Sequence, residues 1–152
     1  SIVGNNFGAG QQARVEGALK IAIVASFVYC VVVQTILNLF RNDFGAIFVD
    51  DPMIISELAR IIPIGTLTLF IFGPQLMIGI YFQAIGDAKR AAILNLSRTY
   101  LFTIPLIVIL PKIIGEPGIW LSGAAAEVMV WGLTIVVLLR IKSRKWGLFQ
   151  PT

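Results

Sequence analysis

Residues 61–86 read IIPIGTLTLFIFGPQLMIGIYFQAIG and contain no charged side chain. The hydrocarbon core of a bilayer is about 30 Å thick and needs roughly 20 apolar residues in a helix to cross it. A buried strand usually ends after about eight residues. The stretch therefore predicts a membrane-spanning helix, which we expect to begin at the Asp51-Pro52 pair and to cover residues 52–86.

Three further apolar runs are long enough to cross a bilayer, and they predict helices over residues 18–40, 91–111 and 118–140. The whole chain of 152 residues is 57% hydrophobic and 13% charged. Soluble domains carry about 25% charged residues, so this chain has too few to cover a surface that faces water. We predict an all-α, polytopic membrane bundle of four helices in one domain, residues 1–152, without a soluble domain.

The charged residues outside the spans divide between the two sides of the membrane that the four spans define. One side holds most of the basic residues: Arg14, Lys20, Lys89, Arg90, Arg140, Lys142, Arg144 and Lys145. The other side holds most of the acids: Asp43, Asp50, Asp51, Glu57 and Glu116. Short loops rich in Lys and Arg stay in the cytoplasm, so we expect both ends of the chain to be cytoplasmic and the protein to reside in the cell (inner) membrane. The net charge of +4 is spread over these helix ends and does not indicate a nucleic-acid partner.

Several classes of chemistry are not expected here. The chain has no histidine, and Cys30 is its only cysteine. An internal disulfide and a cysteine-based metal site are therefore excluded. Without histidine, the commonest general base and metal ligand is missing, and we expect neither an enzyme nor a bound cofactor.

Two charged residues interrupt the predicted spans. Glu127 lies well inside helix 118–140, where a charge is costly unless it faces the bundle interior or a wet cavity. It binds a proton, a cation or a cationic substrate, or it makes a structural hydrogen bond with its carboxyl protonated. Arg98, inside helix 91–111, snorkels to the surface, pairs with a carboxylate or caps exposed carbonyls.

Two amides complete the candidate substrate- or cation-binding site. Gln75 follows Pro74, and a proline frees a carbonyl one turn earlier and bends the helix. Asn95 lies inside helix 91–111, where an interhelical hydrogen bond is the alternative to a cavity-facing role. The Gly-rich segment at residues 4–10 lacks the Lys-Ser/Thr of a phosphate loop, and we expect a turn there.

Four motifs resemble those of the multidrug and toxic compound extrusion (MATE) exporters. They stand in order along the chain: GNNFGAG with Arg14-Val15, YFQAIGDAK at residues 81–89, LSR at 96–98 with IPL and ILP, and GIWL at 118–121 with Ala126-Glu127. In that family the first motif follows the eighth span. The resemblance implies that the four helices are spans nine to twelve of a twelve-span, two-bundle exporter.

The resemblance also implies a function. It implies export of small organic, often cationic, compounds in exchange for Na⁺ or H⁺, with the amino-terminal bundle as partner in the same chain. Some branches of the family place a cation-binding Asp in span ten, but the segment at residues 61–86 has no carboxylate. Because the sequence begins at Ser1 without a signal peptide pattern, we expect it to be a fragment.

Two alternatives remain at this point. A lipid-linked oligosaccharide flippase of the same superfamily predicts several basic residues facing the cavity, whereas Arg98 is the only one available. A membrane module that packs without transporting predicts no wet cavity and Glu127 paired to a neighbour.

Overall fold

The computed structural model describes residues 2–143, and their side chains as far as Ile141. Within that range the elements are all helices joined by short turns, and there is no strand. The elements are α1 (Ile2–Gly8), α2 (Gln12–Leu39), α3 (Arg41–Phe44), the 3₁₀ turn η1 (Gly45–Ile47), α4 (Pro52–Gly65), α5 (Leu69–Ala84), α6 (Ala88–Leu96), the π-helical segment η2 (Ser97–Thr103), α7 (Ile104–Ile114) and α8 (Pro117–Ser143). The all-α prediction is confirmed.

Three of the four predicted spans are long apolar helices: α2, the continuous run Ala88–Ile114 and α8. The fourth differs from the prediction. Instead of one helix over residues 52–86, α4 and α5 are separated by a short break and bent by 52°. The chain therefore has three helices long and apolar enough to cross a membrane, or four if the bent pair forms one span.

The break at residues 66–68 has a local cause and a tertiary one. Pro63 has no N–H to donate to the preceding turn, and Gly65 and the β-branched Thr66 and Thr68 are poor helix formers. The Thr66 hydroxyl donates to Ile62 O at 2.7 Å. From α2, the Gln34 amide oxygen accepts from Phe70 N and the Asn38 amide donates to the Thr66 hydroxyl, so neighbouring side chains bond polar groups that the bend frees.

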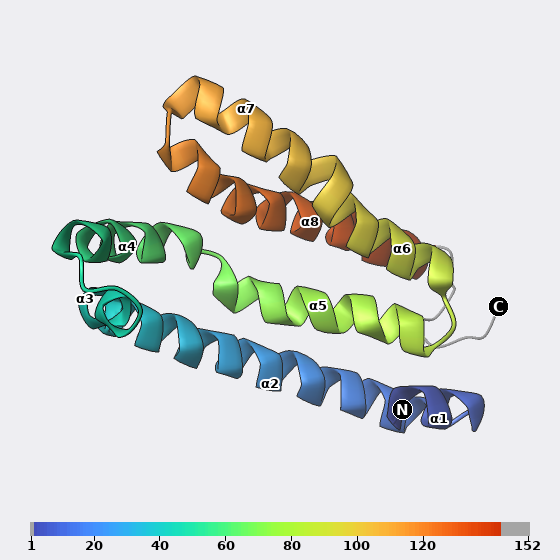
Figure 1. Cartoon of the computed structure of the whole chain (residues 1–152). Coiled ribbons are helices and arrows are strands. Elements are labelled where there is room, and N and C mark those ends of the chain that lie inside the picture. The colour runs from blue at the N-terminus through green and yellow to red at the C-terminus, as the bar shows by residue number, and fades with distance from the viewer. Residues whose placement is uncertain (1, 144–152) are drawn as a thin grey trace.

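The helices form two antiparallel hairpins that lie side by side (Figure 1). In one hairpin α2 packs along α5, and in the other the run α6–η2–α7 packs along α8. Helix α8 also contacts α4 and α5, so it joins the two hairpins.

The hydrophobic core lies at the end of the bundle where α1, α2, α5, α6 and α8 meet. Its buried members are Val15, Ile78, Tyr81, Phe82, Ala91, Leu94 and Ile141. Elsewhere many large apolar side chains are exposed, for example Ile21 at 71% and Leu101 at 61%. Such exposure is unfavourable in water but suits a helix surrounded by lipid or by further helices.

The predicted helix start at Asp51-Pro52 is confirmed, and α6 begins in the same way three residues before the predicted start at residue 91. The Asp51 carboxylate accepts a hydrogen bond from Met53 N at 2.8 Å, with Pro52 in the first turn of α4. Gly86 adopts φ +82° in the tight turn before α6, and the Asp87 carboxylate accepts from Arg90 N at 3.1 Å. Both are the side-chain caps expected for aspartate at a helix N-terminus.

The prediction of a turn over residues 4–10 is wrong for its first part. Residues 4–8 belong to helix α1, and only Ala9 and Gly10 form the turn to α2. Val3 and Phe7 pack against the core, and a Cβ at Gly4 would lie 3.1 Å from Ala84 O of α5. This tertiary contact outweighs the low helix propensity of the two glycines and two asparagines.

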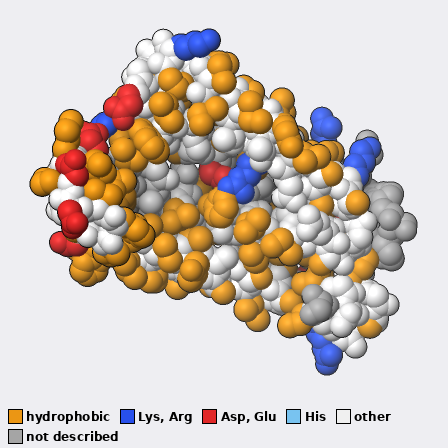
Figure 2. Space-filling model, viewed as in Figure 1, with side chains coloured by type: hydrophobic (Ala, Val, Ile, Leu, Met, Phe, Trp, Pro, Cys, Tyr) orange, Lys and Arg blue, Asp and Glu red, His pale blue; other side chains and the backbone are white. Residues whose placement is uncertain are grey.

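Charged side chains gather at the two ends of the bundle, as the sequence predicts. Figure 2 shows acidic side chains together over one end and basic ones toward the other. We call these the acidic end, with Asp43, Asp50, Asp51, Glu57 and Glu116, and the basic end, with Arg14, Lys20, Lys89, Arg90 and Arg140. Arg144 and Lys145 lie outside the described residues, and the cytoplasmic placement of the basic end stays a prediction.

Candidate substrate- and cation-binding site

The two charged residues predicted inside the spans meet in an ion pair between helices. Arg98 Nη2 lies 2.6 Å from Glu127 Oε1. Glu127 is the tenth residue after the start of α8, which at 1.5 Å per residue is about 15 Å along a span that crosses roughly 30 Å. The pair therefore lies well inside the span rather than at its ends, and Figure 2 shows one acidic and one basic side chain together in a hollow between the two ends.

The two partners differ in burial. The Glu127 side chain is 8% exposed, whereas the Arg98 side chain is 26% exposed. Glu127 Oε2 is buried and has no hydrogen-bond partner. A buried carboxylate oxygen without a partner is costly, so this atom is where a proton, a cation or a donor from a ligand would be stabilising.

Arg98 is presented by the π-helical segment η2. The Thr103 hydroxyl donates to Arg98 O at 2.8 Å, and Pro105 has no N–H to donate to the turn before it. Single π-turns inside α-helices are found frequently at functional sites. The local sequence thus interrupts the regular α-helix at the position of Arg98.

A third helix completes the environment of Arg98. Its guanidinium carbon lies 4.0 Å from the centroid of the Phe72 ring in α5, within the range of a cation–π interaction. Arg98 thereby connects α5 with Glu127 of α8. Phe72 is absent from the sequence-predicted site, because an aromatic residue in a membrane helix has no sequence signal that separates this role from packing.

Gln75 is placed next to α8 but not in contact with the ion pair. It is 4% exposed, and its Nε2 donates to Thr134 Oγ1 at 2.7 Å. Thr134 is fully buried, and its hydroxyl donates to Val130 O at 2.9 Å. The predicted cavity-facing position of Gln75 is replaced by an interhelical hydrogen bond, and its role in binding stays a prediction.

Asn95 contacts α5 rather than the ion pair. A Cβ at Gly79 would lie 2.6 Å from Asn95 Oδ1, so the glycine makes room for the amide. Asn95 therefore packs against α5, and its role in binding stays a prediction. Of the four predicted residues, the structure therefore brings together Glu127 and Arg98 and places Gln75 and Asn95 in separate helix contacts.

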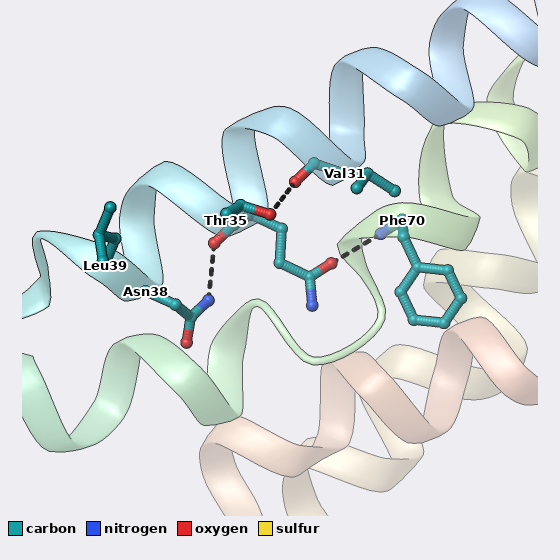
Figure 3. A pocket seen from close by; sticks show the side chains of 6 residues that line it. Val31, Thr35, Asn38, Leu39 and Phe70 are labelled. Carbon is teal, nitrogen blue, oxygen red and sulfur yellow. Dashed lines mark hydrogen bonds between the residues drawn. The ribbon is translucent and has the colours of Figure 1, made fainter.

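Two open pockets are lined by none of these four residues. Both pockets border α5, the helix that carries Gln75. One, of about 570 Å³, lies beside the break between α4 and α5 and is lined by Val31, Gln34, Thr35, Asn38, Leu39 and Phe70 (Figure 3). The other, of about 690 Å³, is an apolar groove between α1, α2 and α5 near Arg14. Among the described residues, no cluster of His, Cys, Asp and Glu has the composition to hold a metal ion.

The comparisons with known proteins decide the family. The MatE family model matches residues 1–109, which is most of the chain. The chain belongs to the MATE family. The resemblance of its four motifs to MATE exporters is thereby confirmed, and this is a family of transporters rather than enzymes.

Several MATE relatives match nearly the whole chain. Protein DETOXIFICATION 16 of Arabidopsis thaliana is 28% identical over 90% of this chain and 29% of its own length. Protein DETOXIFICATION 17 of the same plant is 32% identical over the same shares. An uncharacterized transporter of Schizosaccharomyces pombe is 28% identical over 86% of this chain and 25% of its own length.

The chain spans less than a third of the length of these curated relatives. No solved structure matches it. Membership of a transporter family and the apolar helices together show a multi-pass membrane protein.

Proposed function

We propose that this chain is the carboxy-terminal part of a multidrug exporter that drives small organic cations out of the cell in exchange for Na⁺ or H⁺. Its four spans rock against an amino-terminal bundle of the same protein, with the substrate held between the two. Glu127 is the carboxylate that holds the cation or the proton. The chain alone does not transport, because half of the cavity wall belongs to the other bundle.

The observation that carries the proposal is the placement of Glu127. Its carboxyl group is buried well inside a span, and one of its two oxygens has no partner. An ionisable group at this depth is costly to keep and marks ion or substrate pathways in membrane proteins. A cation or proton that binds and leaves would satisfy the second oxygen during part of each cycle.

The two alternatives fare differently. A packing module predicts that Glu127 is paired, and it is paired with Arg98, but only through one oxygen. Membership of a transporter family further favours transport over packing. A flippase for lipid-linked oligosaccharides needs several basic groups for a pyrophosphate, whereas Arg98 is the one basic residue of the described spans that lies between the acidic and basic ends of the bundle, and it is already engaged by Glu127.

The test is drug efflux from cells that carry the full-length gene. We expect Glu127→Gln to reduce export at least tenfold under both Na⁺ and proton gradients, because the amide holds neither a cation nor a transferable proton. The matched control is Glu57→Gln, the same substitution at an exposed position of the acidic end. Export and drug resistance at the wild-type level in Glu127→Gln would contradict the proposal.

A further inference from the structure

Arg98 occupies the two contacts that an organic cation would use at this site. Its guanidinium meets a carboxylate oxygen of Glu127 at 2.6 Å and the face of the Phe72 ring at 4.0 Å. A carboxylate beside an aromatic face is the common recognition unit for quaternary ammonium and other delocalised cations. The side chain of the protein therefore fills the place of a ligand.

We propose that Arg98 is a resident cation, which a monovalent aromatic cation displaces from Glu127 and Phe72 and which returns to expel that cation at the end of the cycle. The inference rests on the proposed function, because it takes Glu127 as the cation-binding carboxylate. It adds the group of the protein that competes with the organic cation.

The contacts of Arg98 suit displacement. A guanidinium has five N–H donors, and bidentate pairing with a carboxylate gives the strongest geometry. Arg98 contacts only one of the two carboxylate oxygens of Glu127. Arg60 at the acidic end instead places Nη2 at 2.7 and 2.9 Å from the two oxygens of Glu116, and its Nε at 2.9 Å from Glu57 Oε2.

The position of Arg98 allows its side chain to move away from Glu127. It is the more exposed partner of the pair, and it lies on η2, where the regular helix is already interrupted. It is the tenth residue after the start of α6, about 15 Å from the basic end. A long arginine side chain that leaves Glu127 keeps its charged group in water by extending toward that end.

Glu127 stays neutralised throughout the exchange, while the displaced Arg98 keeps its positive charge and carries it toward water at the basic end. With Arg98 in place, Glu127 is neutralised and the membrane interior holds no net charge at the pair. An incoming monovalent cation takes over the same neutralisation, and the unpaired Glu127 Oε2 gives it an acceptor that Arg98 does not use. An anionic substrate would instead bind Arg98 and leave Glu127 unpaired in the membrane, which is unfavourable.

The experiment measures binding of tetraphenylphosphonium to the purified full-length protein. If Arg98 competes with the cation, Arg98→Gln removes the competitor, and we expect at least tenfold tighter binding together with slower export, since release loses its driving group. Arg98→Lys keeps the ion pair and the fold but loses the planar contact with Phe72, so binding should tighten by a smaller factor. Arg60→Gln, the matched control at an exposed arginine, should leave binding unchanged.

Glu127→Gln, made alone and in the Arg98→Gln background, distinguishes a failure of the proposed binding site from a failure of the displacement by Arg98. Binding that is insensitive to Glu127→Gln in both backgrounds overturns the proposed site itself. Binding that is lost in Glu127→Gln but unchanged or weaker in both Arg98 variants overturns only the displacement. If the protein with Arg98 present binds an anionic dye more tightly than tetraphenylphosphonium, the assigned substrate class is likewise contradicted.

Discussion

At the scale of single residues, the polar groups inside the bundle are matched across helices. Gln75 and Thr134 hydrogen-bond between α5 and α8, although 59 positions separate them in the sequence. One turn away, Trp131 Nε1 donates to Ile71 O at 3.0 Å, in the turn of α5 that precedes Pro74. These two bonds hold α8 against the part of α5 that presents Phe72 to Arg98.

The Gln75–Thr134 bond makes a first prediction about stability. Thr134→Val removes the hydroxyl and leaves the Gln75 amide without its partner in a buried position. We expect the free energy of unfolding of the full-length protein to fall by about 1 kcal/mol, which is typical of hydrogen bonds between membrane helices. Thr134→Ser keeps the hydroxyl and should lose less. Equal thermal unfolding of the Val variant and the wild type in detergent would contradict this assignment.

At the scale of elements, the break between α4 and α5 is held open by α2. Gln34 Oε1 accepts from Phe70 N at 3.2 Å in the first turn of α5 (Figure 3). Asn38 Nδ2 donates to Thr66 Oγ1 at 3.0 Å, at the break itself. The first amides of a helix have no intrahelical partner, so an amide oxygen from a neighbouring helix serves as the cap. Tertiary contacts thus stabilise a bent span that the hydropathy pattern predicts as continuous.

The cap on α5 is testable by hydrogen exchange. Gln34→Leu removes the acceptor for Phe70 N, so deuterium uptake in the peptide that covers residues 66–72 should rise in the full-length protein in nanodiscs. Thr35→Val is the matched control, because the Thr35 hydroxyl donates only within its own helix, to Val31 O at 2.7 Å. Equal uptake in Gln34→Leu and Thr35→Val would show that α5 does not depend on this cap.

At the scale of the whole molecule, the two hairpins are joined at three levels. The apolar core joins them at the basic end, and Arg98 joins α5 to Glu127 near the middle. At the acidic end Arg60 of α4 reaches Glu116, in the turn between α7 and α8. Since the contact between Arg60 and Glu116 consists only of exposed polar groups, it is the easiest of the three to open.

The outer contact should open in acid. Hydrogen bonds from Trp120 Nε1 and from Arg60 hold the pKa of the Glu116 carboxyl below its ordinary value. A lowered pKa in the folded state means that the contact is fully stabilising above the unfolded pKa of about 4.3 and is lost as pH falls through the folded value. A spin-label distance between α4 and the α7–α8 turn should therefore stay constant down to about pH 5 and lengthen in stronger acid.

The variant Glu116→Gln should show the longer distance at neutral pH already, whereas Glu57→Gln should keep the shorter one. A distance that does not change with pH in the wild type, or that is equal in the two variants, would contradict the role of Glu116.

Local patterns in the sequence determined the helical fold class, the four apolar stretches, the separation of acidic and basic ends, and the cap at Asp51. An apolar run long enough to cross a membrane and the capping of a helix N-terminus both involve residues that are neighbours in the chain. Both can therefore be recognised in the sequence without a structure. The sequence also marked Glu127 and Arg98, because a charge inside an apolar run is unusual wherever it points.

Only the tertiary structure decided that these two residues pair, that Phe72 lies against Arg98, that Gln75 bonds Thr134 and that Asn95 packs on Gly79. It also decided the bend between α4 and α5 and the helical conformation of residues 4–8. Each of these depends on which helix faces which, and all membrane helices are apolar around most of their surface, so periodicity in one of them does not reveal its neighbour.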